Sequence, residues 1–328
     1  MPDLTVIVPT HNRSRLLRQA LLSVLWQRDV DLEVIVVDDG SSDDTASVVS
    51  GLCDARIRMV RHRVPRGVSA ARNQGIGEAR GDWVAFLDDD DLWAPEKLAE
   101  QLRAARLERR SWAYTGHVNV TLDMRVIGGA RPAPPEEVVE RLPRANEIPG
   151  GGSNVIVHRE TLTEAGPFDG RLKNTEDWDM WIRLSRLGPP AWVCRPFVGY
   201  RIHPGAASLD TRQLLMGAAL IESRYGGPID WVALHRHLGR VLLRAGRWRE
   251  ALPQYLRAAT RADRDYLTGE FRADLGGALA SGLNAARRRF IRRFPHLGSL
   301  PSTEVRPPEA FRAWRDEGEA WLRELRSV

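Results

Sequence analysis

DWVAFLDDDDLW, residues 82–93, is the stretch on which the interpretation of this chain depends, because an apolar run ends there in four consecutive carboxylates. Like charges repel, and side chains two apart in an extended segment share one face. The run from Asp88 to Asp91 therefore costs stability unless a cation or helix N-termini offset the repulsion. Two interpretations fit the stretch alone: a solvated acidic cap on the helix that follows, or a site that binds a cation.

The segments around this run alternate between strand and helix patterns. Apolar runs predict strands at 4–9, 32–39, 57–62 and 82–88. Apolar residues at helical spacing predict helices that follow these strands, at 14–27, 41–52, 67–79 and 94–109. Continuously apolar strands are typical of a buried parallel sheet, which binds ligands beyond the carboxyl ends of its strands. Those ends carry PTHNR (9–13), DDGSSDD (38–44) and the four aspartates, so we expect one site at this edge.

The second half of the chain divides near residue 207. Before that point, the Pro- and Gly-rich residues 128–154 predict a loop or lid whose mobility comes from Gly150 to Gly152. A strand (153–158), a helix (175–188) and one or two strands (191–203) follow. Helical periodicity dominates after about 210, with a last helix at 307–326. We therefore expect an α/β domain over 1–207 and an all-α domain over 208–328.

Composition limits the classes of protein to consider. The N-terminus and the apolar runs predict neither a signal peptide nor a membrane span, and two cysteines, Cys53 and Cys194, suit a reducing cytoplasm. The net charge of +5 comes almost entirely from arginine, which we attribute to codon composition rather than to nucleic-acid binding. One dense cluster, RRRFIRR (287–293), is either a solvated helix face or a peripheral contact with an anionic membrane surface.

Four motifs together resemble a known family. VIVPTHNR, VVDDGSSDDT, the block from GVSAARNQGIGEA to FLDDDDLW, and NTEDWDMWIRL stand in the order and spacing of family 2 glycosyltransferases. The resemblance covers about residues 4–205. It implies a GT-A fold, which is Rossmann-like with a mostly parallel sheet flanked by helices. It also implies that a sugar passes from a nucleoside diphosphate donor to an acceptor hydroxyl with inversion at the anomeric carbon.

The resemblance gives the acidic run a role. The departing diphosphate gains negative charge, which Mg²⁺ or Mn²⁺ held by carboxylate oxygens neutralises. By similarity to the D-x-D motif of the family, Asp90 is expected to ligate the metal, and Asp88 faces the ribose or the metal's waters. Asp89 is assigned with Asp88 to the nucleotide-sugar donor, although it lies on the other face if the segment is extended, and Asp91 caps the next helix. Four aspartates in a row leave this register open by one residue.

Other residues are assigned to the donor by the same resemblance. Asp39 is expected to accept a hydrogen bond from a pyrimidine ring, which favours UDP or dTDP over GDP, and Pro9, Thr10 and Arg13 border the base. Arg72 either reaches a phosphate or forms a structural salt bridge. His203 either completes the metal shell or is structural.

An inverting displacement needs a base for the acceptor's proton. The family places it in a Glu-Asp pair, matched here by Glu176 and Asp177, and Asp177 is our candidate. A competing role for Asp177 is the N-cap of the helix that opens there. Trp178 and Trp181 either stack on sugars or pack in the core.

The helical region leaves the acceptor open. Residues 237–260 resemble one tetratricopeptide unit, with Leu238, Gly239, Gly246, Ala251, Tyr255 and Ala258 at its small, apolar and aromatic positions. Such a unit is a structural annex or homodimer surface, or it holds the acceptor, which is a sugar, a lipid-linked sugar, a metabolite or a peptide.

We expect an enzyme of surface-polysaccharide or glycosylated-metabolite synthesis; alternatives are a peptide or protein glycosyltransferase and a non-catalytic nucleotide-sugar-binding scaffold. The absence of glycine from PTHNRSR (9–15) argues against a nucleotidyltransferase.

Overall fold

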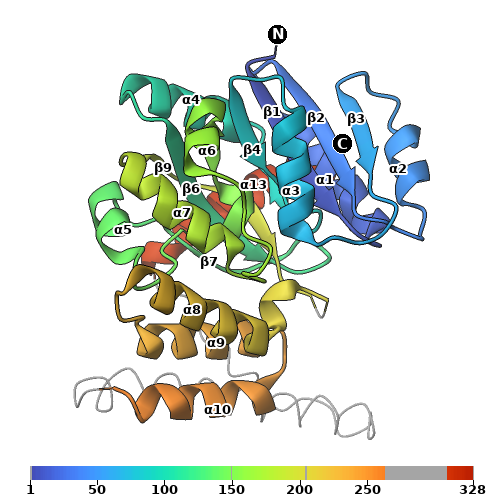
Figure 1. The fold of residues 1–328 in the computed structure, drawn as a ribbon. Coiled ribbons are helices and arrows are strands. Elements are labelled where there is room, and N and C mark those ends of the chain that lie inside the picture. Colours follow the sequence, from blue (N-terminus) through green and yellow to red (C-terminus); the bar gives the residue numbers. More distant parts are fainter. Residues whose placement is uncertain (1, 149, 204, 263–308, 328) are drawn as a thin grey trace, which may run out of the picture.

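The computed structural model describes residues 2–148, 150–203, 205–262 and 309–327. One nine-stranded sheet organises the first two thirds of the chain (Figure 1). Its first half is parallel, in the order β3 (Ile57–Arg61), β2 (Leu32–Asp38), β1 (Leu4–Thr10) and β4 (Trp83–Phe86). The predicted strands of the N-terminal half are all present, and their carboxyl ends share one edge.

The second half of the sheet is mixed. It continues from β4 through four strands, β8 (Ile156–His158), β6 (Trp112–Val120), β9 (Ala191–Arg201) and β5 (Leu92–Trp93), and β7 (Val126–Ala130) pairs with β6 outside that order. Of the paired strands in this half of the described sheet, β6 and β9 are parallel, and the other pairs are antiparallel. Strands β6 and β7 were not predicted, and residues 128–154 are therefore not one long loop.

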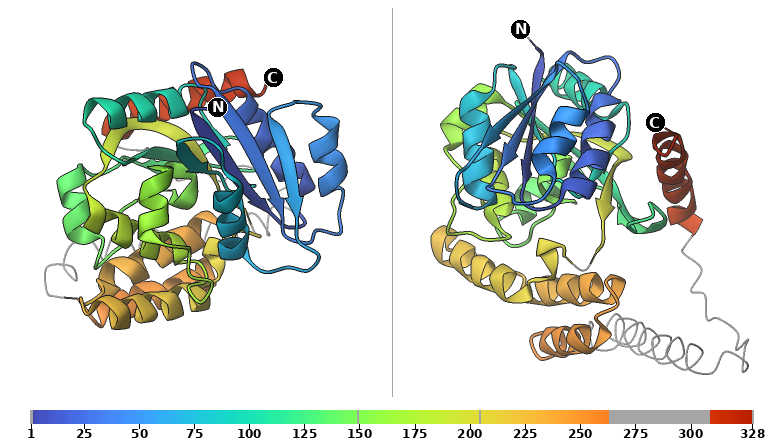
Figure 2. Two further views of the ribbon diagram at one scale, coloured as in Figure 1. Left: turned by 45° about the horizontal axis from the view of Figure 1, so that its top comes forward. Right: turned by 90° about the vertical axis from the view of Figure 1, so that its right-hand side faces the viewer.

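Helices cover both faces of the sheet (Figure 2). The helices of this region are α1 (Ser14–Leu25), α2 (Thr45–Gly51), α3 (Val68–Glu78), α4 (Lys97–Leu107), α5 (Pro135–Arg141), α6 (Arg159–Ala165) and α7 (Glu176–Leu187). Alternate residues of β1 and β2 point to opposite sides: Val6 and Val34 pack with α1 and α4, whereas Ile7 and Ile35 pack with α3 and α7. Trp178 and Trp181 are buried in this core rather than available to stack on a sugar.

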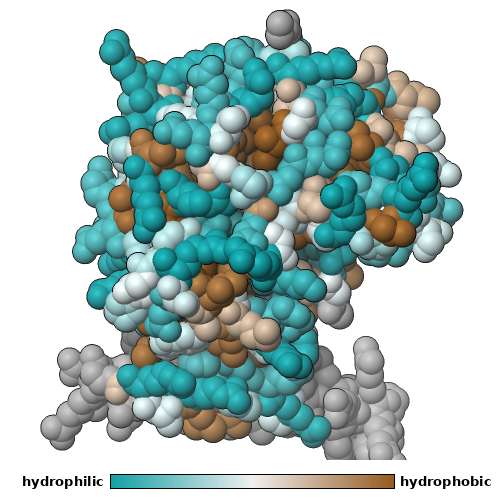
Figure 3. Space-filling view, in the orientation of Figure 1, coloured by the Kyte–Doolittle hydropathy of each residue, from teal (hydrophilic) through white to brown (hydrophobic). Residues whose placement is uncertain are grey.

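A helical layer lies beside the sheet region (Figure 1). It contains the one-turn 3-10 helix η2 (Ala207–Leu209) and the helices α8 (Thr211–Tyr225), α9 (Trp231–Arg244) and α10 (Trp248–Ala259). Helices α9 and α10 pack closely, because a Cβ on Gly239 would lie 2.6 Å from the Tyr255 ring. The resemblance of this pair to a tetratricopeptide unit stays a prediction. A hydrophobic patch lies over α8, where Met216 and Leu220 are exposed, and it is one of several hydrophobic areas on this face (Figure 3).

The last helix, α13 (Glu309–Leu325), leaves the helical layer and packs on β6, β7 and β9. Trp314, Trp321 and Leu322 form one buried cluster with Leu92, Val118 and Phe197. The division near residue 207 stays a prediction, although the final helix packs on the sheet region. The cluster at 287–293 lies outside the described residues. No helix in the described ranges is long and apolar enough to cross a bilayer.

Candidate active site

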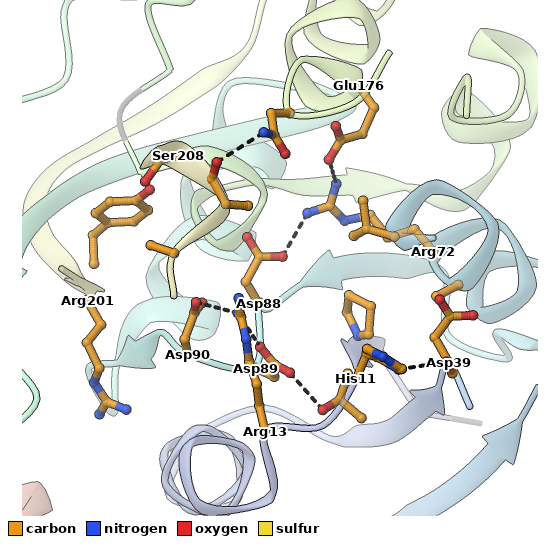
Figure 4. Close-up of a pocket in the computed structure, with 18 residues that line it drawn as sticks. His11, Arg13, Asp39, Arg72, Asp88, Asp89, Asp90, Glu176, Arg201 and Ser208 are labelled. Carbon is orange, nitrogen blue, oxygen red and sulfur yellow. Dashed lines mark hydrogen bonds and ion pairs between the residues drawn. The ribbon is translucent and has the colours of Figure 1, made fainter. Parts of the chain in front are cut away.

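A cavity of about 300 Å³ opens at the carboxyl ends of β1, β2 and β4 (Figure 4). All of the predicted donor residues line it, together with the metal candidate Asp90: Pro9, Thr10, Arg13, Asp39, Arg72, Asp88, Asp89 and Asp90. The structure thus places three separate polar clusters of the sequence around one space. Residues that the sequence analysis did not single out complete its walls: His11, Val68, Ala71, Asn174, Tyr200, Arg201, Ala206, Ala207 and Ser208.

The acidic run is a turn and not an extended segment, because the Asp91 backbone N–H donates to the Asp88 carbonyl over 3.0 Å. Asp89 consequently lines the same cavity as Asp88 and Asp90, and the extended segment that would have put it on the other face is not formed. The prediction that Asp91 caps the next helix is wrong, because the N-cap residue of α4 is Glu96. The fully buried carboxylate of Asp91 accepts bonds from Ser153 Oγ at 2.6 Å and the Arg201 backbone N–H at 3.0 Å.

Cations and hydrogen-bond donors offset the repulsion within the run. Arg13 Nη1 lies 2.6 Å from Asp90 Oδ2 and 3.1 Å from Asp89 Oδ1. Burial would raise the pKa of Asp90, but the hydrogen bond from His203 and the charge of Arg13 hold it below its ordinary value. Burial and the charge of Asp90 raise the pKa of Asp89 to about 7. Arg13 therefore forms ion pairs with Asp89 and Asp90. Its contact with the nucleobase of the donor remains a prediction.

His203 is next to the carboxylate that the resemblance assigns to a metal. Its Nε2 lies 2.9 Å from Asp90 Oδ2. Within the part of the chain that the structure describes, no three His, Cys, Asp or Glu side chains are arranged to hold a metal ion. One carboxylate and one imidazole still fit a hard divalent cation that takes its other ligands from water and substrate phosphates.

Arg72 lies at the centre of a second ion cluster. The guanidinium is 3 % exposed and bridges Asp88 Oδ1 at 2.7 Å and Glu176 Oε1 at 2.8 Å. Burial would lower its pKa, but the negative charges of Asp88, Glu176 and Asp177 hold the pKa of Arg72 above its ordinary value. The structural salt bridge, one of the two roles left open for Arg72, is formed.

Asp39 closes the cavity on the side of β2. Its carboxylate accepts hydrogen bonds from His62 Nδ1 at 2.7 Å and from the backbone N–H groups of Arg66 and Gly67 at 2.8 and 2.7 Å. Burial would raise the pKa of Asp39, but these bonds lower it below its ordinary value. The group is therefore a fixed anion, suited to accept one further N–H from a ligand.

Asp177 lies at the start of α7, beside the cavity lining and next to Glu176. Its Oδ1 accepts the Trp178 backbone N–H at 2.7 Å, and Oδ2 is 3.3 Å from the position of a Cβ on Gly151. The N-cap residue of α7 is Thr175, so Asp177 satisfies a first-turn donor without being the cap. Burial and the charge of Glu176 raise the pKa of Asp177 to about 7.

The three glycines Gly150–Gly152, which precede β8, are closely packed. A Cβ on Gly152 would lie 2.9 Å from Arg72 Nη2, and one on Gly150 would lie 3.1 Å from Asn154 Nδ2. Gly150 and Gly151 also have positive φ angles, +79° and +59°. Close packing and backbone conformation therefore favour glycine at these positions, a reason that differs from the predicted mobility.

The fold and the acidic edge define the class as a GT-A glycosyltransferase. Residues 5–160 match the family model described as glycosyl transferase family 2. The chain is 30% identical over 212 residues to an uncharacterized glycosyltransferase of Haemophilus influenzae, a match covering 63% of this chain and 71% of that protein. The chain belongs to glycosyltransferase family 2.

Other relatives match over different lengths. Identity is 26% over 226 residues to the UDP-Glc:α-D-GlcNAc-diphosphoundecaprenol β-1,3-glucosyltransferase WfaP of Escherichia coli, covering 68% of this chain and 87% of that one. It is 41% over 125 residues to the succinoglycan biosynthesis protein ExoO of Rhizobium meliloti, covering 38% of this chain but only 36% of ExoO. A crystal structure of S. aureus TarS 1–349 with UDP-GlcNAc shares the fold, with a TM-score of 0.55, 17% identity and coverage of 85% and 81%.

Proposed function

We propose that this protein transfers a sugar from a nucleoside diphosphate donor, UDP or dTDP in preference to GDP, to a hydroxyl of a lipid-linked acceptor sugar, with inversion. The observation that carries the proposal is the convergence of Asp39, Arg72 and the acidic run on one cavity. The named activity of WfaP supports the choice of a lipid-linked acceptor. Synthesis of a surface polysaccharide, at the inner face of the cytoplasmic membrane, is the process that suits such an acceptor.

The base and the diphosphate of the donor would contact different side chains in this cavity. Asp39, a fixed carboxylate, accepts an N–H of the pyrimidine, while Pro9 and Thr10 form the neighbouring wall. Asp88 lies where the ribose or water molecules can reach it, because its side chain is 30% exposed. Asp90 and His203 are the residues that would hold Mg²⁺ or Mn²⁺, which when bound supplies the charge that neutralises the departing diphosphate. Arg13 and Arg201 add fixed positive charge at the same end.

Arg201 adds a buried positive charge beside this end of the cavity. It is 1% exposed, and none of its three guanidinium nitrogens has a hydrogen-bond partner among the described residues. Burial lowers its pKa, which means that its charge is poorly compensated. Because these nitrogens are buried and the guanidinium points away from the cavity (Figure 4), the charge would favour a bound anion through space rather than by direct contact.

Asp177 serves as the base. A carboxylate whose conjugate acid has a pKa of about 7 is a better proton acceptor than an ordinary aspartate, and about half of it is ionised at pH 7. Glu176 keeps Arg72 in place and adds the negative charge that raises this pKa. The acceptor hydroxyl would approach Asp177 from the side of Gly151.

The test is a transfer assay on the full chain with UDP-, dTDP- and GDP-sugars, offered a GlcNAc-diphosphate lipid, free sugars and peptides. Mass spectrometry identifies the product and NMR its anomeric configuration. We expect an inverted linkage on the lipid-linked sugar. Transfer to a peptide alone would support the alternative that the helical layer holds a peptide or protein. Nucleotide binding without transfer to any acceptor would indicate a non-catalytic scaffold.

A further inference from the structure

Arg13 places a cation of the protein itself at the acidic edge of the cavity. Its Nη1 donates to Asp90 Oδ2 at 2.6 Å and to Asp89 Oδ1 at 3.1 Å, and its Nη2 donates to the Gly205 carbonyl at 2.7 Å. The two carboxylate side chains are 13% and 6% exposed, whereas the Arg13 side chain is 29% exposed. Three acceptors therefore hold the guanidinium against the acidic run, and it is the more exposed partner in both ion pairs (Figure 4).

The oxygen that Arg13 contacts on Asp90 is the one next to the imidazole. Asp90 Oδ2 lies 2.9 Å from His203 Nε2 as well as 2.6 Å from the guanidinium. A divalent cation held by Asp90 and His203 would lie at this oxygen, where a guanidinium nitrogen already is. Two cations on one carboxylate oxygen repel each other, so the metal and Arg13 compete for Asp90.

The cavity provides a second anion for Arg13 only when the donor is bound. Arg13 lines the same space as the acidic run, and in the proposed function that space holds the diphosphate. A guanidinium binds phosphate oxygens as well as it binds carboxylates, with the same bidentate geometry. The diphosphate would therefore replace the carboxylates as the partner of Arg13, while the metal replaces Arg13 as the partner of Asp90.

Neither ligand alone completes this exchange. The metal alone would displace Arg13 from Asp89 and Asp90 and leave the guanidinium without a counter-charge. The diphosphate alone would meet a guanidinium that two carboxylates already neutralise. Only when both bind does each charge of the edge keep an opposite charge beside it, so we expect the two ligands to raise each other's affinity.

We propose that Arg13 is an internal counter-cation, which occupies the metal's place at Asp90 until metal and nucleoside diphosphate bind together and then pairs with the diphosphate. This inference rests on the proposed function for the metal and the donor. It gives Arg13 a positioning role in donor binding that differs from the predicted contact with the base. It also means that the acidic edge does not hold a free metal ion tightly before the donor arrives.

The first test is Mn²⁺ binding by the full chain without nucleotide, measured by electron paramagnetic resonance of the unbound ion. We expect Arg13→Gln to bind Mn²⁺ about tenfold or more tightly than the unmodified protein, a factor in the usual range of coupling between sites. Adding Asp90→Ala to Arg13→Gln should remove the gain and so locate it at this carboxylate. A gain in affinity is not expected from misfolding, because a disrupted site binds metal less well.

Arg15→Gln is the matched control. It removes an exposed arginine from the start of α1, two residues after Arg13. Because the charges of exposed side chains are screened by solvent and salt, its Mn²⁺ affinity should stay within about twofold of the unmodified protein. Equal gains in Arg13→Gln and Arg15→Gln would show a general effect of net charge and would overturn the inference.

The second test is the gain in UDP affinity that Mn²⁺ produces, measured by calorimetry. We expect this gain to be at least about fivefold smaller in Arg13→Gln than in the unmodified protein, because the metal no longer displaces a cation and the diphosphate loses its guanidinium. The Arg15→Gln protein should keep the full gain.

The outcomes separate this inference from the proposed function. An Arg13→Gln protein that matches Arg15→Gln in both tests would overturn the inference, and UDP binding with Mn²⁺ and sugar transfer by the unmodified chain would then leave the proposed function standing. An unmodified chain that binds no nucleoside diphosphate with Mn²⁺ would overturn the proposed function and the exchange with it.

Discussion

Neighbouring aspartates in the acidic run have different partners and hence different chemistry. Asp88 pairs with Arg72, Asp90 with Arg13 and His203, and Asp91 with Ser153 and a backbone N–H. Only a turn can direct consecutive side chains to so many separate partners. The cost of gathering four carboxylates is thus only partly offset within the protein. Burial and the charge of Asp90 keep the pKa of both Asp89 and Asp91 above its ordinary value, whereas the pKa of Asp90 itself stays low, which suits a carboxylate that binds a cation.

Asp177 gives a prediction of pH dependence. Its pKa is raised to about 7, chiefly by burial and then by the charge of Glu176, so the protonated form, which cannot accept a proton, dominates below that pH. We expect kcat/KM to rise with pH through an apparent pKa near 7 and to level off above it. Asp177→Asn should lower kcat about 10²–10⁴-fold with little change in UDP affinity.

A control for this profile is Asp31→Asn, which changes an exposed carboxylate at the opposite, amino end of the parallel strands. It should keep both the rate and the pH profile. A profile that is flat from pH 5.5 to 8, or an Asp177→Asn variant that retains near-normal turnover, would remove Asp177 from the role of base.

The sequence predicted many of the residues that line the cavity, chiefly those in motifs at strand ends, and their roles stay predictions. It did not single out His11, nor lining residues from later segments such as Tyr200 and Arg201. Thr10, Asp39 and Asp88 follow buried strands directly, so the sheet places them. His11 and Arg201 carry no comparable signal. His11 lies inside a recognised motif without a distinct role, and the sequence around Arg201 does not distinguish it from any other arginine after a strand. What marks Arg201 is burial without a partner, which only the structure shows.

At the scale of elements, α7 is held in place by a buried carboxylate. Asp179 is fully buried and accepts hydrogen bonds from Arg183 on its own helix at 2.9 Å and from Arg224 and Tyr225 of α8 at 2.6 and 2.7 Å. Arg224 also bonds Asp169 in the loop before α7. This network ties the helix that begins with Glu176 and Asp177 to the first helix of the helical layer.

We predict that Asp179→Ala lowers the free energy of unfolding by about 3–5 kcal/mol, because it leaves two guanidinium groups without their shared anion. Urea denaturation followed by circular dichroism measures the change. Asp210→Ala, which removes only a cap at the start of α8, should cost about 1 kcal/mol and serves as the comparison. Equal costs for the two variants would mean that the network contributes no more than an ordinary cap.

The elements that were predicted and those that were missed differ in pattern. The N-terminal strands are continuous apolar runs bounded by turn residues, and they were found. Strand β6 alternates apolar with polar or small residues, WAYTGHVNV (112–120), and follows a helix after only a short connection. Its polar positions, His117 and Asn119, are explained by the helical layer against which they are buried, and that layer lies about 100 residues later in the chain.

At the scale of the whole molecule, α13 returns to the catalytic sheet. Trp321 is 6% exposed, its ring nitrogen donates to the Pro196 carbonyl at 2.9 Å, and its ring is 3.0 Å from the Cβ position of Gly199. Periodicity was sufficient to predict the helix but not its partner. Any amphipathic helix at the end of a helical region would have been assigned to that region.

The packing of α13 predicts that Trp321→Ala lowers the free energy of unfolding by about 3–5 kcal/mol, as for other large buried aromatics. Leu107→Ala, at a site that is 77% exposed, should change it by less than about 0.5 kcal/mol. Chemical denaturation of both variants measures the difference. A Trp321→Ala protein as stable as Leu107→Ala would contradict the docking of α13 on the sheet.

The central claim is that the acidic edge binds the diphosphate of a pyrimidine nucleotide through a divalent cation, and calorimetric titration tests it most directly. UDP, dTDP and GDP are titrated with and without Mn²⁺ into the unmodified protein, Asp90→Ala and the Asp31→Ala control. The account predicts that a pyrimidine diphosphate binds only with the metal, that Asp90→Ala abolishes this binding, and that Asp31→Ala preserves it. Binding that is equally strong without the metal and in Asp90→Ala would contradict the account.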